Sequence, residues 1–277
     1  MIVLEHIVKQ HPAFQLDIAH LRVGRGLTLL IGKNGAGKST LLRLMATAET
    51  ADSGSIRYGG VTAAQALPMI RSQIGYLPVG LELYEEMTPP QLLRYLAELK
   101  GIGTAKSEID RLLSAFRLDS QRGQKIRTLA QGMKQSLGIC QAMLGSPAFL
   151  LLDEPLSYLD GLERRNAVTQ LFRYAAGERC VVVATHELNE WHGAGRLLWL
   201  DRGIVRYHGS TDCWIDTSDY PERVWTGVVA MEEREEVLRG LVSGDKVISQ
   251  RALDEQRLEL RVIAPERPNR SFSPVAA

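Results

Sequence analysis

GKNGAGKST, residues 32–40, places a glycine, four further residues and then Gly-Lys-Ser in the order that is typical of a phosphate-binding loop. An apolar run from Leu27 to Ile31 precedes it and predicts a buried strand. The sequence LLRLMAT follows it and predicts a helix. A strand, a glycine loop and a helix in this order are the context that the motif requires, so the sequence predicts a site for a nucleoside triphosphate.

We expect this phosphate loop to bind mainly through its backbone. Its glycines let N–H groups turn inward, and the N-terminus of the following helix adds partial positive charge. Lys38 is expected to reach the β- and γ-phosphates, and the Ser39 hydroxyl to hold Mg²⁺. The predicted nucleotide-binding residues of the loop are Asn34, Gly35, Ala36, Gly37, Lys38, Ser39 and Thr40.

Composition bounds the class of protein. A chain of 277 residues with 45% hydrophobic and 23% charged residues suits one large α/β domain with an insertion or a small appendage. A net charge of +1 gives no field that would draw the whole chain onto nucleic acid, so no nucleic-acid partner is expected. The three cysteines are odd in number and widely spaced, which favours buried reduced thiols over a disulfide framework.

The sequence also predicts no membrane-spanning segment, because no apolar run approaches the ~18–20 residues that a spanning helix needs. The start, MIVLEHIVKQ, alternates like a strand and contains Glu5, so it is not read as a signal peptide. We therefore expect any work on a membrane to require separate subunits.

The hydrophobic pattern predicts the order of elements along the chain. Strands are expected near 2–8, 14–23, 27–31, 54–60, 74–77, 149–153 and 180–186, with a hairpin at 196–209. One helix is expected to start at Thr88, and three more are expected near 105–116, 131–144 and 161–176. Residues ~86–147 are interpreted as an all-helical insertion in an α/β body that covers 1–215. Residues 216–277 are interpreted as an extension with strands near 224–230, 246–249 and 257–263, a helix at 232–241 and a disordered tail.

A second motif lies at Phe149–Glu154, where an apolar strand ends in paired acids. At the carboxyl end of a parallel sheet both carboxylates would lie near the phosphates. We expect Asp153 to hold Mg²⁺ and Glu154 to orient or deprotonate the attacking water. His186 ends the next apolar strand, and we expect it to donate to the γ-phosphate, so that Lys38, Glu154 and His186 form the catalytic set. The plainer alternatives are a solvated strand end and a structural histidine.

In this order, the motifs resemble those of an ATP-binding cassette ATPase. The family's Walker A, signature, Walker B, D-loop and switch histidine are matched by residues 32–40, TLAQGMKQ at 128–135, 149–154, SYLD at 157–160, and His186. The resemblance covers about residues 1–212 and implies an α/β fold: a RecA-like P-loop NTPase core with an antiparallel β-subdomain, a helical insertion and a small α+β extension. The run QGMKQ, with a short C-terminal extension, is similar to nucleotide-binding subunits of ABC-2-type exporters.

The resemblance implies ATP and Mg²⁺ as ligands, and a mechanism in which two cassettes close head to tail over two ATPs. Gln131, Gly132 and the start of the following helix would face the partner's γ-phosphate, and Asp160 would run along the dimer interface. Transmembrane permease subunits are the implied partners, at the cytoplasmic face of the membrane. The second cassette could be the same chain or a different one.

Two motifs depart from the family pattern. Where the family reads IGYLPQ, residues 74–79 read IGYLPV, so the usual glutamine is Val79, unless a shifted loop uses Gln73. In the signature, Ala130 and Gln131 replace the usual serine and first glycine. Losing one donor to developing charge can slow chemistry by ~10²–10³-fold, and Gln131 could supply a replacement donor. We therefore expect a slow ATPase, or one whose second site is completed by a different cassette.

The platform for the adenine base is also unusual. The family stacks the base on an aromatic residue just after the first strand, and the aligned residue here is His11, with Phe14 as a nearby substitute. An ordinary surface turn is the alternative. The segment 79–90, VGLELYEEMTPP, either receives the membrane partner, as it does in the family, or is a plain linker.

Two other functions compete with an energy-coupling transport ATPase. One is a nucleotide-binding regulatory cassette that seldom hydrolyses ATP, which the departures at Val79 and Ala130 favour. The other is a cassette protein that acts on DNA or ribosomes without transport. Against the latter, the ~90 residues between the phosphate loop and the signature contain no heptads of a long coiled coil, and the chain has one cassette rather than two in tandem.

Overall fold

The computed structural model describes residues 1–12, 14–103, 105–186, 190–191, 193–211, 224–233, 246–252, 257–263 and 272–274. The chain divides into two compact units, Met1–His208 and Gly209–Ala277, and each is described by itself. The strands of the first unit are β1 (Ile2–Gln10), β2 (Gln15–Val23), β3 (Gly26–Ile31), β4 (Ser53–Tyr58), β5 (Val61–Thr62), β6 (Ile74–Leu77), β7 (Phe149–Asp153), β8 (Cys180–Ala184), β9 (Arg196–Asp201) and β10 (Ile204–Ser210). Its helices are α1 (Lys38–Met45), α2 (Ala63–Ser72), α3 (Pro89–Leu99), α4 (Lys106–Ala115), α5 (Gln131–Met143) and α6 (Gly161–Ala176).

The strands of the first unit form one ten-stranded sheet in the order β5-β4-β1-β2-β10-β9-β3-β8-β7-β6. Its central run, β9-β3-β8-β7-β6, is parallel. The strands β7 and β8 are buried at every position, as expected where a parallel sheet is covered on both faces. This confirms the predicted α/β body, and it directs the carboxyl ends of β3, β7 and β8 toward one edge.

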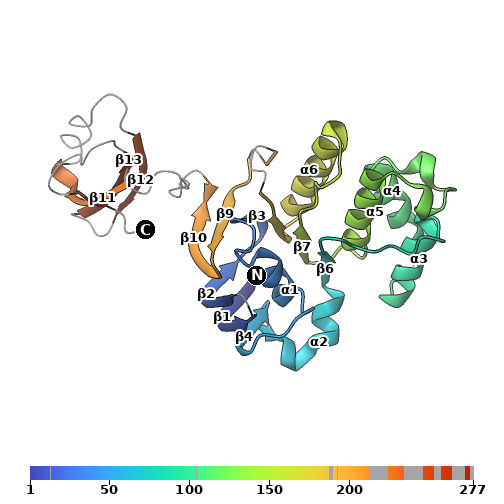
Figure 1. Cartoon of the computed structure of the whole chain (residues 1–277), viewed down its shortest axis with the longest axis horizontal. Coiled ribbons are helices and arrows are strands. Elements are labelled where there is room, and N and C mark those ends of the chain that lie inside the picture. The colour runs from blue at the N-terminus through green and yellow to red at the C-terminus, as the bar shows by residue number, and fades with distance from the viewer. Residues whose placement is uncertain are drawn as a thin grey trace. The chain divides into compact units, whose positions relative to one another are not determined.

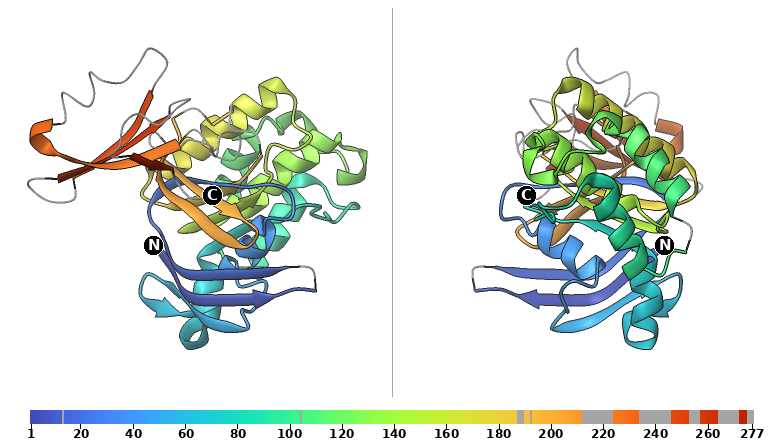
Figure 2. Two further views of the ribbon diagram at one scale, coloured as in Figure 1. Left: turned by 60° about the vertical axis from the view of Figure 1, so that its left-hand side comes forward. Right: turned by 90° about the vertical axis from the view of Figure 1, so that its right-hand side faces the viewer.

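The other end of the sheet is antiparallel. Strand β1 pairs with β2 on one side and with β4 on the other, with Ile2 opposite Val23 and opposite Tyr58. Buried and exposed residues alternate along most of β2, because one face of this part is wet. In Figure 2 the blue strands β1 and β2 run side by side as a ribbon. The turn that joins them is the segment in which the base platform is predicted.

The helical insertion is made of α3, α4 and α5, which Figure 1 shows grouped beside β6 and β7. Helix α3 begins as the sequence predicts: the Gln91 side chain accepts a hydrogen bond from the Thr88 backbone N–H at 2.9 Å, and Pro89 occupies the first turn. Helix α5 packs directly onto β6. A Cβ atom added to Gly75 would lie 1.9 Å from the Ala142 carbonyl oxygen, so this contact requires glycine.

Two features differ from the sequence-based expectation. Helix α2 was not anticipated, because Pro68 lies inside it and its backbone is kinked at Ala66, which breaks the helical pattern. In the second unit a four-stranded sheet has the order β12 (Lys246–Ala252), β13 (Arg257–Ile263), β11 (Val224–Ala230) and β14 (Phe272–Pro274). The expected disordered tail is therefore wrong for Phe272–Pro274, which pairs antiparallel with β11 and so satisfies backbone groups of an edge strand.

The helix expected at 232–241 falls mostly outside the described residues. Its first two positions are described and belong to a 3₁₀ turn at Met231–Glu233. Cys140 and Cys180 are free and buried, as predicted, and Cys213 lies outside the described residues. In the described parts of the chain, no helix combines the length and the apolar character needed to cross a bilayer.

Candidate functional site

Three parallel strands end side by side at one edge of the sheet. The Thr185 N–H donates to the Leu30 carbonyl at 3.1 Å, and the Glu154 N–H donates to the Ala184 carbonyl at 2.9 Å. The first bond joins the residue after β8 to β3, and the second joins the residue after β7 to the end of β8. The phosphate loop, the acidic pair and His186 therefore lie close together, as the sequence predicts for the carboxyl end of an open α/β sheet.

The phosphate loop leads from β3 into α1. Asn34 and Gly35 are exposed, whereas Lys38 is 8% exposed and donates from Nζ to the Gly32 carbonyl at 2.7 Å. The ammonium group thus folds back over the loop. Helix α1 begins with its first N–H groups at this loop, which gives an anion the partial positive charge of a helix N-terminus.

The close packing around the loop explains two of its glycines. A Cβ atom on Gly32 would lie 2.2 Å from the Leu200 carbonyl oxygen. Gly37 has a φ of +103°, and a Cβ atom there would lie 3.0 Å from Phe14 Cε2. The turn between β9 and β10 supports the same loop, since the Gly203 N–H donates to the Ala36 carbonyl at 2.9 Å. The loop is therefore held by the β9–β10 hairpin and by Phe14 of the β1–β2 turn.

The two acids at the carboxyl end of β7 have different surroundings. Asp153 is 2% exposed, and burial raises the pKa of its carboxyl group, while the hydrogen bond from Ser39 acts in the opposite direction. The negative charge of Glu154 raises the pKa of Asp153 further, and Lys38 lowers it. Asp153 is thus placed against the phosphate loop, with Ser39 as its direct partner.

Glu154 faces His186 across the edge of the sheet. Its Oε2 atom lies 3.0 Å from His186 Nδ1, and its backbone adopts a left-handed conformation with φ of 49°. A glutamate in this conformation is uncommon and is held here by the bond to Ala184. The side chain of Glu154 is 21% exposed and that of His186 is 60% exposed, so both can meet a ligand from solvent.

The donor set near the loop fits Mg²⁺. Ser39 and Asp153 supply a hydroxyl and a carboxylate oxygen in contact with each other, and Mg²⁺ usually takes one or two protein oxygens together with phosphate oxygens and water. Within the described residues no three His, Cys, Asp or Glu side chains form a metal cluster.

The two residues predicted as candidates for the base platform lie next to each other. His11 and Phe14 are stacked, with ring centroids 5.1 Å apart and planes 8° from parallel. Phe14 also reaches the phosphate loop at Gly37. His11 Nε2 lies 3.4 Å from Glu49 Oε1, in a geometry that falls short of a hydrogen bond. The structure thus brings both candidates for the platform together.

The signature residues lie at the start of α5. Ala130 and Gln131 are exposed and Gly132 is buried. A Cβ atom on Gly132 would lie 2.9 Å from the Tyr158 carbonyl oxygen and 2.6 Å from Glu163 Oε2, so the D-loop packs directly on the signature. Gln131 and Gly132 are therefore grouped with the D-loop.

Asp160 has a clear structural role at the start of α6. Its side chain accepts hydrogen bonds from the backbone of Leu162 at 2.9 Å and of Glu163 at 2.8 Å, while Glu163 accepts from the Asp160 N–H at 3.0 Å. This capping box fixes the D-loop against the helix. Both Tyr158, at 69%, and Asp160 are exposed residues of the D-loop.

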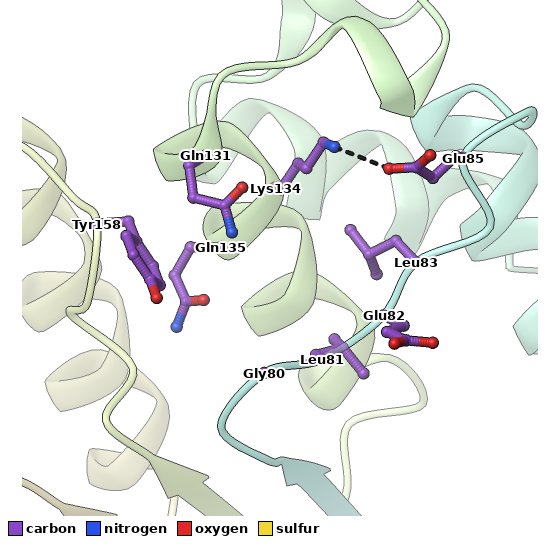
Figure 3. A pocket seen from close by; sticks show the side chains of 9 residues that line it. All are labelled: Gly80, Leu81, Glu82, Leu83, Glu85, Gln131, Lys134, Gln135 and Tyr158. Carbon is purple, nitrogen blue, oxygen red and sulfur yellow. Dashed lines mark hydrogen bonds and ion pairs between the residues drawn. The ribbon is translucent and has the colours of Figure 1, made fainter.

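A pocket of about 510 Å³ lies between the segment after β6, the first turns of α5 and the D-loop (Figure 3). It is lined by Gly80, Leu81, Glu82, Leu83, Glu85, Gln131, Lys134, Gln135 and Tyr158. Figure 3 shows Tyr158 facing Gln131 and Gln135 of α5. Leu81 and Leu83 line the pocket from the segment that follows β6. The segment 79–90 and the signature thus share one pocket.

Ion pairs tie this segment to the helical insertion. Glu85 Oε1 lies 3.1 Å from Lys134 Nζ on α5. Glu86 lies 2.6 Å from Lys125 Nζ and 3.3 Å from Arg127 Nε. Both acids therefore have partners within the chain, which the sequence did not indicate.

The structure removes one alternative for the missing glutamine. Gln73 follows α2 at the amino end of β6, where its backbone carbonyl accepts from the Phe149 N–H at 3.0 Å. It lies at the opposite end of the strand from the site. Val79 follows the carboxyl end of β6 and is 62% exposed, so the position after Pro78 has no polar side chain to offer.

Three residues with contacts to the site were missed by sequence reasoning. Gln135 donates from Nε2 to the carbonyls of Glu154 at 3.3 Å and Pro155 at 3.2 Å, which links α5 to the acidic pair. Arg43 and Glu49 pair with each other and connect α1 to the base platform. The second glutamine of QGMKQ was a usable signal, whereas no spacing rule relates Glu49 to His11.

Comparisons with known proteins agree with this geometry. The profile of the family described as ABC transporter matches residues 16–157, about half of the chain. The chain is 31% identical over 188 residues to the phospholipid-transporting ATPase ABCA3 of Rattus norvegicus, covering 67% of this chain and 11% of that protein. It is 33% identical over 186 residues to the probable multidrug ABC transporter ATP-binding protein YbhF of Escherichia coli (strain K12), covering 66% of this chain and 32% of that protein. The chain therefore spans a third or less of the length of these relatives.

Solved structures show the same fold. An ATP-binding subunit of an ABC transporter matches with a TM-score of 0.70 and 28% identity, over 76% of this chain and 90% of that chain. The dimeric bacterial ABC transporter cassette MJ0796 matches with a TM-score of 0.66, over 76% of this chain and 98% of that chain, and at 21% identity it supports the fold alone. On these matches, the chain belongs to the ABC transporter family and carries its ATP-binding cassette.

Proposed function

We propose that this chain binds and hydrolyses ATP to power a membrane transporter of the exporter type, through closure of a nucleotide-bridged dimer. Its partners are a second cassette, identical or different, and transmembrane permease subunits at the cytoplasmic face of a membrane, where this chain binds peripherally. The named relative YbhF, a probable multidrug transporter protein, supports the exporter assignment. The dimeric form of MJ0796 supports the pairing.

One observation supports the proposal that this chain hydrolyses ATP. Glu154 Oε2 lies 3.0 Å from His186 Nδ1, beside the phosphate loop. In the proposed reaction Lys38 leaves the Gly32 carbonyl and contacts the β- and γ-phosphates. Glu154 orients the attacking water and accepts its proton, and His186 donates to the γ-phosphate. Ser39 and Asp153 are the residues that would hold Mg²⁺, which neutralises charge on the phosphate oxygens when bound.

The phosphate loop offers a matched pair of lysines for the test. Lys38 is buried and bonded to the loop, whereas Lys33 is exposed in the same loop. Lys38→Ala should abolish measurable Mg-ATP binding and hydrolysis, while Lys33→Ala should keep both. Binding is measured by titration calorimetry and turnover by phosphate release. Unchanged ATP binding by Lys38→Ala would refute the proposal.

A weakly hydrolysing regulatory cassette is the second candidate, favoured by the exposed Val79 and Ala130. Ala130 supplies no hydroxyl to a phosphate, and Val79 supplies no amide to water or Mg²⁺. The two candidates differ in turnover with the membrane partner present. An exporter subunit should hydrolyse ATP faster when reconstituted with its permease subunits, and a regulator should not respond.

A further inference from the structure

Glu49 is a carboxylate that lies beyond the end of α1 and outside the predicted site. Its side chain is 19% exposed, and its two oxygen atoms have different partners. Oε2 accepts a hydrogen bond from Arg43 Nε at 2.9 Å. Oε1 lies 3.4 Å from His11 Nε2 and 3.7 Å from Lys9 Nζ. One carboxylate thus joins the helix after the phosphate loop to the β1–β2 turn.

Arg43 carries this connection into the phosphate loop. Its Nη2 atom donates to Thr40 Oγ1 at 3.1 Å, and Thr40 is 4% exposed. The Glu49 N–H also donates to the Arg43 carbonyl at 3.2 Å, so backbone and side chain hold the same pair. The chain of contacts therefore runs from Glu49 through Arg43 to Thr40.

At the other end of the connection stands the stacked pair of rings. The His11 N–H donates to the Phe14 carbonyl at 2.9 Å, which closes the turn beneath the two rings. Phe14 contacts the loop at Gly37. Aromatic faces of this kind bind any nucleic base by stacking. Base and phosphates are parts of one ligand, so the distance between platform and loop decides whether both can be bound at once.

We propose that Glu49 is a positioning residue for the base of the nucleotide, holding the His11–Phe14 pair in register with the phosphate loop. This rests on the proposed function, since the nucleotide must occupy that loop. Removing the negative charge leaves Arg43 without its carboxylate partner and leaves Lys9 paired with Asp52 alone. The electrostatic attraction that joins α1 to the β1–β2 turn is then lost, and the rings lose their fixed distance from Thr40.

The test separates base binding from phosphate binding. Glu49→Gln is titrated with Mg-ATP and, separately, with magnesium tripolyphosphate, which has no base. Asp52→Asn is the matched control, because Asp52 anchors the same turn through Lys9 Nζ at 2.9 Å and the Gln10 N–H at 2.7 Å. Thermal unfolding checks that both variants fold.

Glu49→Gln should weaken ATP binding by about fivefold, the lower end of what base stacking contributes. Its tripolyphosphate affinity should stay within about twofold, and Asp52→Asn should lose less ATP affinity than Glu49→Gln. If Glu49 acts through the platform, His11→Ala combined with Glu49→Gln should bind ATP no more weakly than His11→Ala alone.

Three results would overturn this inference: unchanged ATP affinity in Glu49→Gln, an equal loss for ATP and tripolyphosphate, or an equal loss in Asp52→Asn. A Glu49→Gln chain that no longer unfolds cooperatively would also count against it, because the role would then be structural. Failure of the proposed function looks different, since the unmodified chain would then bind neither ATP nor tripolyphosphate.

Discussion

Replacing Glu154 by glutamine tests the catalytic assignment with little change in shape. The backbone at this position is fixed by the bond from its N–H to the Ala184 carbonyl, which does not depend on the side chain. Glutamine fills the same volume and can still accept a hydrogen bond from His186 Nδ1. What is lost is the negative charge and the capacity to accept a proton from water.

The expected effect on chemistry is large and the effect on stability is small. A general base contributes ~10²–10⁴-fold to rate, which corresponds to about 3–5 kcal/mol of activation free energy. The pair with His186 is partly exposed, and such pairs contribute about 1 kcal/mol or less to folding. ATP binding should persist, because the phosphate loop is unchanged and the substitution removes a negative charge that would repel the phosphates.

The assay measures phosphate release and the oligomeric state together. Glu154→Gln with Mg-ATP should release phosphate at least about 10²-fold more slowly, and it should elute as a dimer in size-exclusion chromatography. Glu178→Gln is the control, because Glu178 forms an exposed pair with Arg25 at 3.0 Å and lies outside the predicted set. Turnover within a factor of a few of the unmodified chain would refute the role of Glu154.

Three further changes have clear expected outcomes. Gly75→Ala should destabilise the fold by about 3 kcal/mol or more, because its Cβ would lie 1.9 Å from a backbone carbonyl oxygen of α5. Gly123→Ala is the control and should not destabilise the fold, because a Cβ atom there meets no other atom within 4 Å; thermal unfolding compares the two variants. Burial lowers the pKa of Lys100 from 10.5, so the unfolded chain binds this proton more tightly and stability rises as pH increases from the lowered value toward 10.5. Urea unfolding across that pH range should show that the free energy of unfolding rises less steeply with pH in Lys100→Met than in the unmodified chain. An unchanged dependence on pH would contradict the effect of burial on Lys100. Combining Val79→Gln with Ala130→Ser should raise turnover by up to about 10²-fold in a steady-state phosphate assay, and no increase would mean that these departures do not limit the rate.

Local sequence was sufficient where one short segment contains both an element and its chemistry. The strand, loop and helix around residues 32–40 needed no distant partner to be recognised. The acids after β7 were found for the same reason, since an apolar run ending in Asp-Glu points to the edge of a buried strand. Helix α6 has the bounds that the sequence predicts, 161–176, and the structure shows a capping box of Asp160 and Glu163 at its start.

Contacts between distant segments could not be predicted in this way. Glu49 meets His11 across 38 positions of sequence (49 − 11), and neither residue type indicates the other. Strand β14 depends on the free edge of β11, a property of the folded sheet rather than of the sequence FSP. The segment 79–90 is predicted from sequence to receive the membrane partner or to be a plain linker, and neither alternative indicates that Glu85 and Glu86 take partners on and beside α5.

Those two acids give the helical insertion a mechanical property. Residues 85 and 86 are clamped to Lys134 inside the signature and to Lys125 and Arg127 just before it. A displacement of residues 85–86 would therefore act on the start of α5 through these ion pairs, which are partly exposed to solvent and therefore individually weak. Reversing the charge of one acid would break its ion pair within the chain as well as any contact with a partner protein. A compensated exchange, such as Glu85→Lys with Lys134→Glu, keeps the ion pair while it reverses the charge at residue 85.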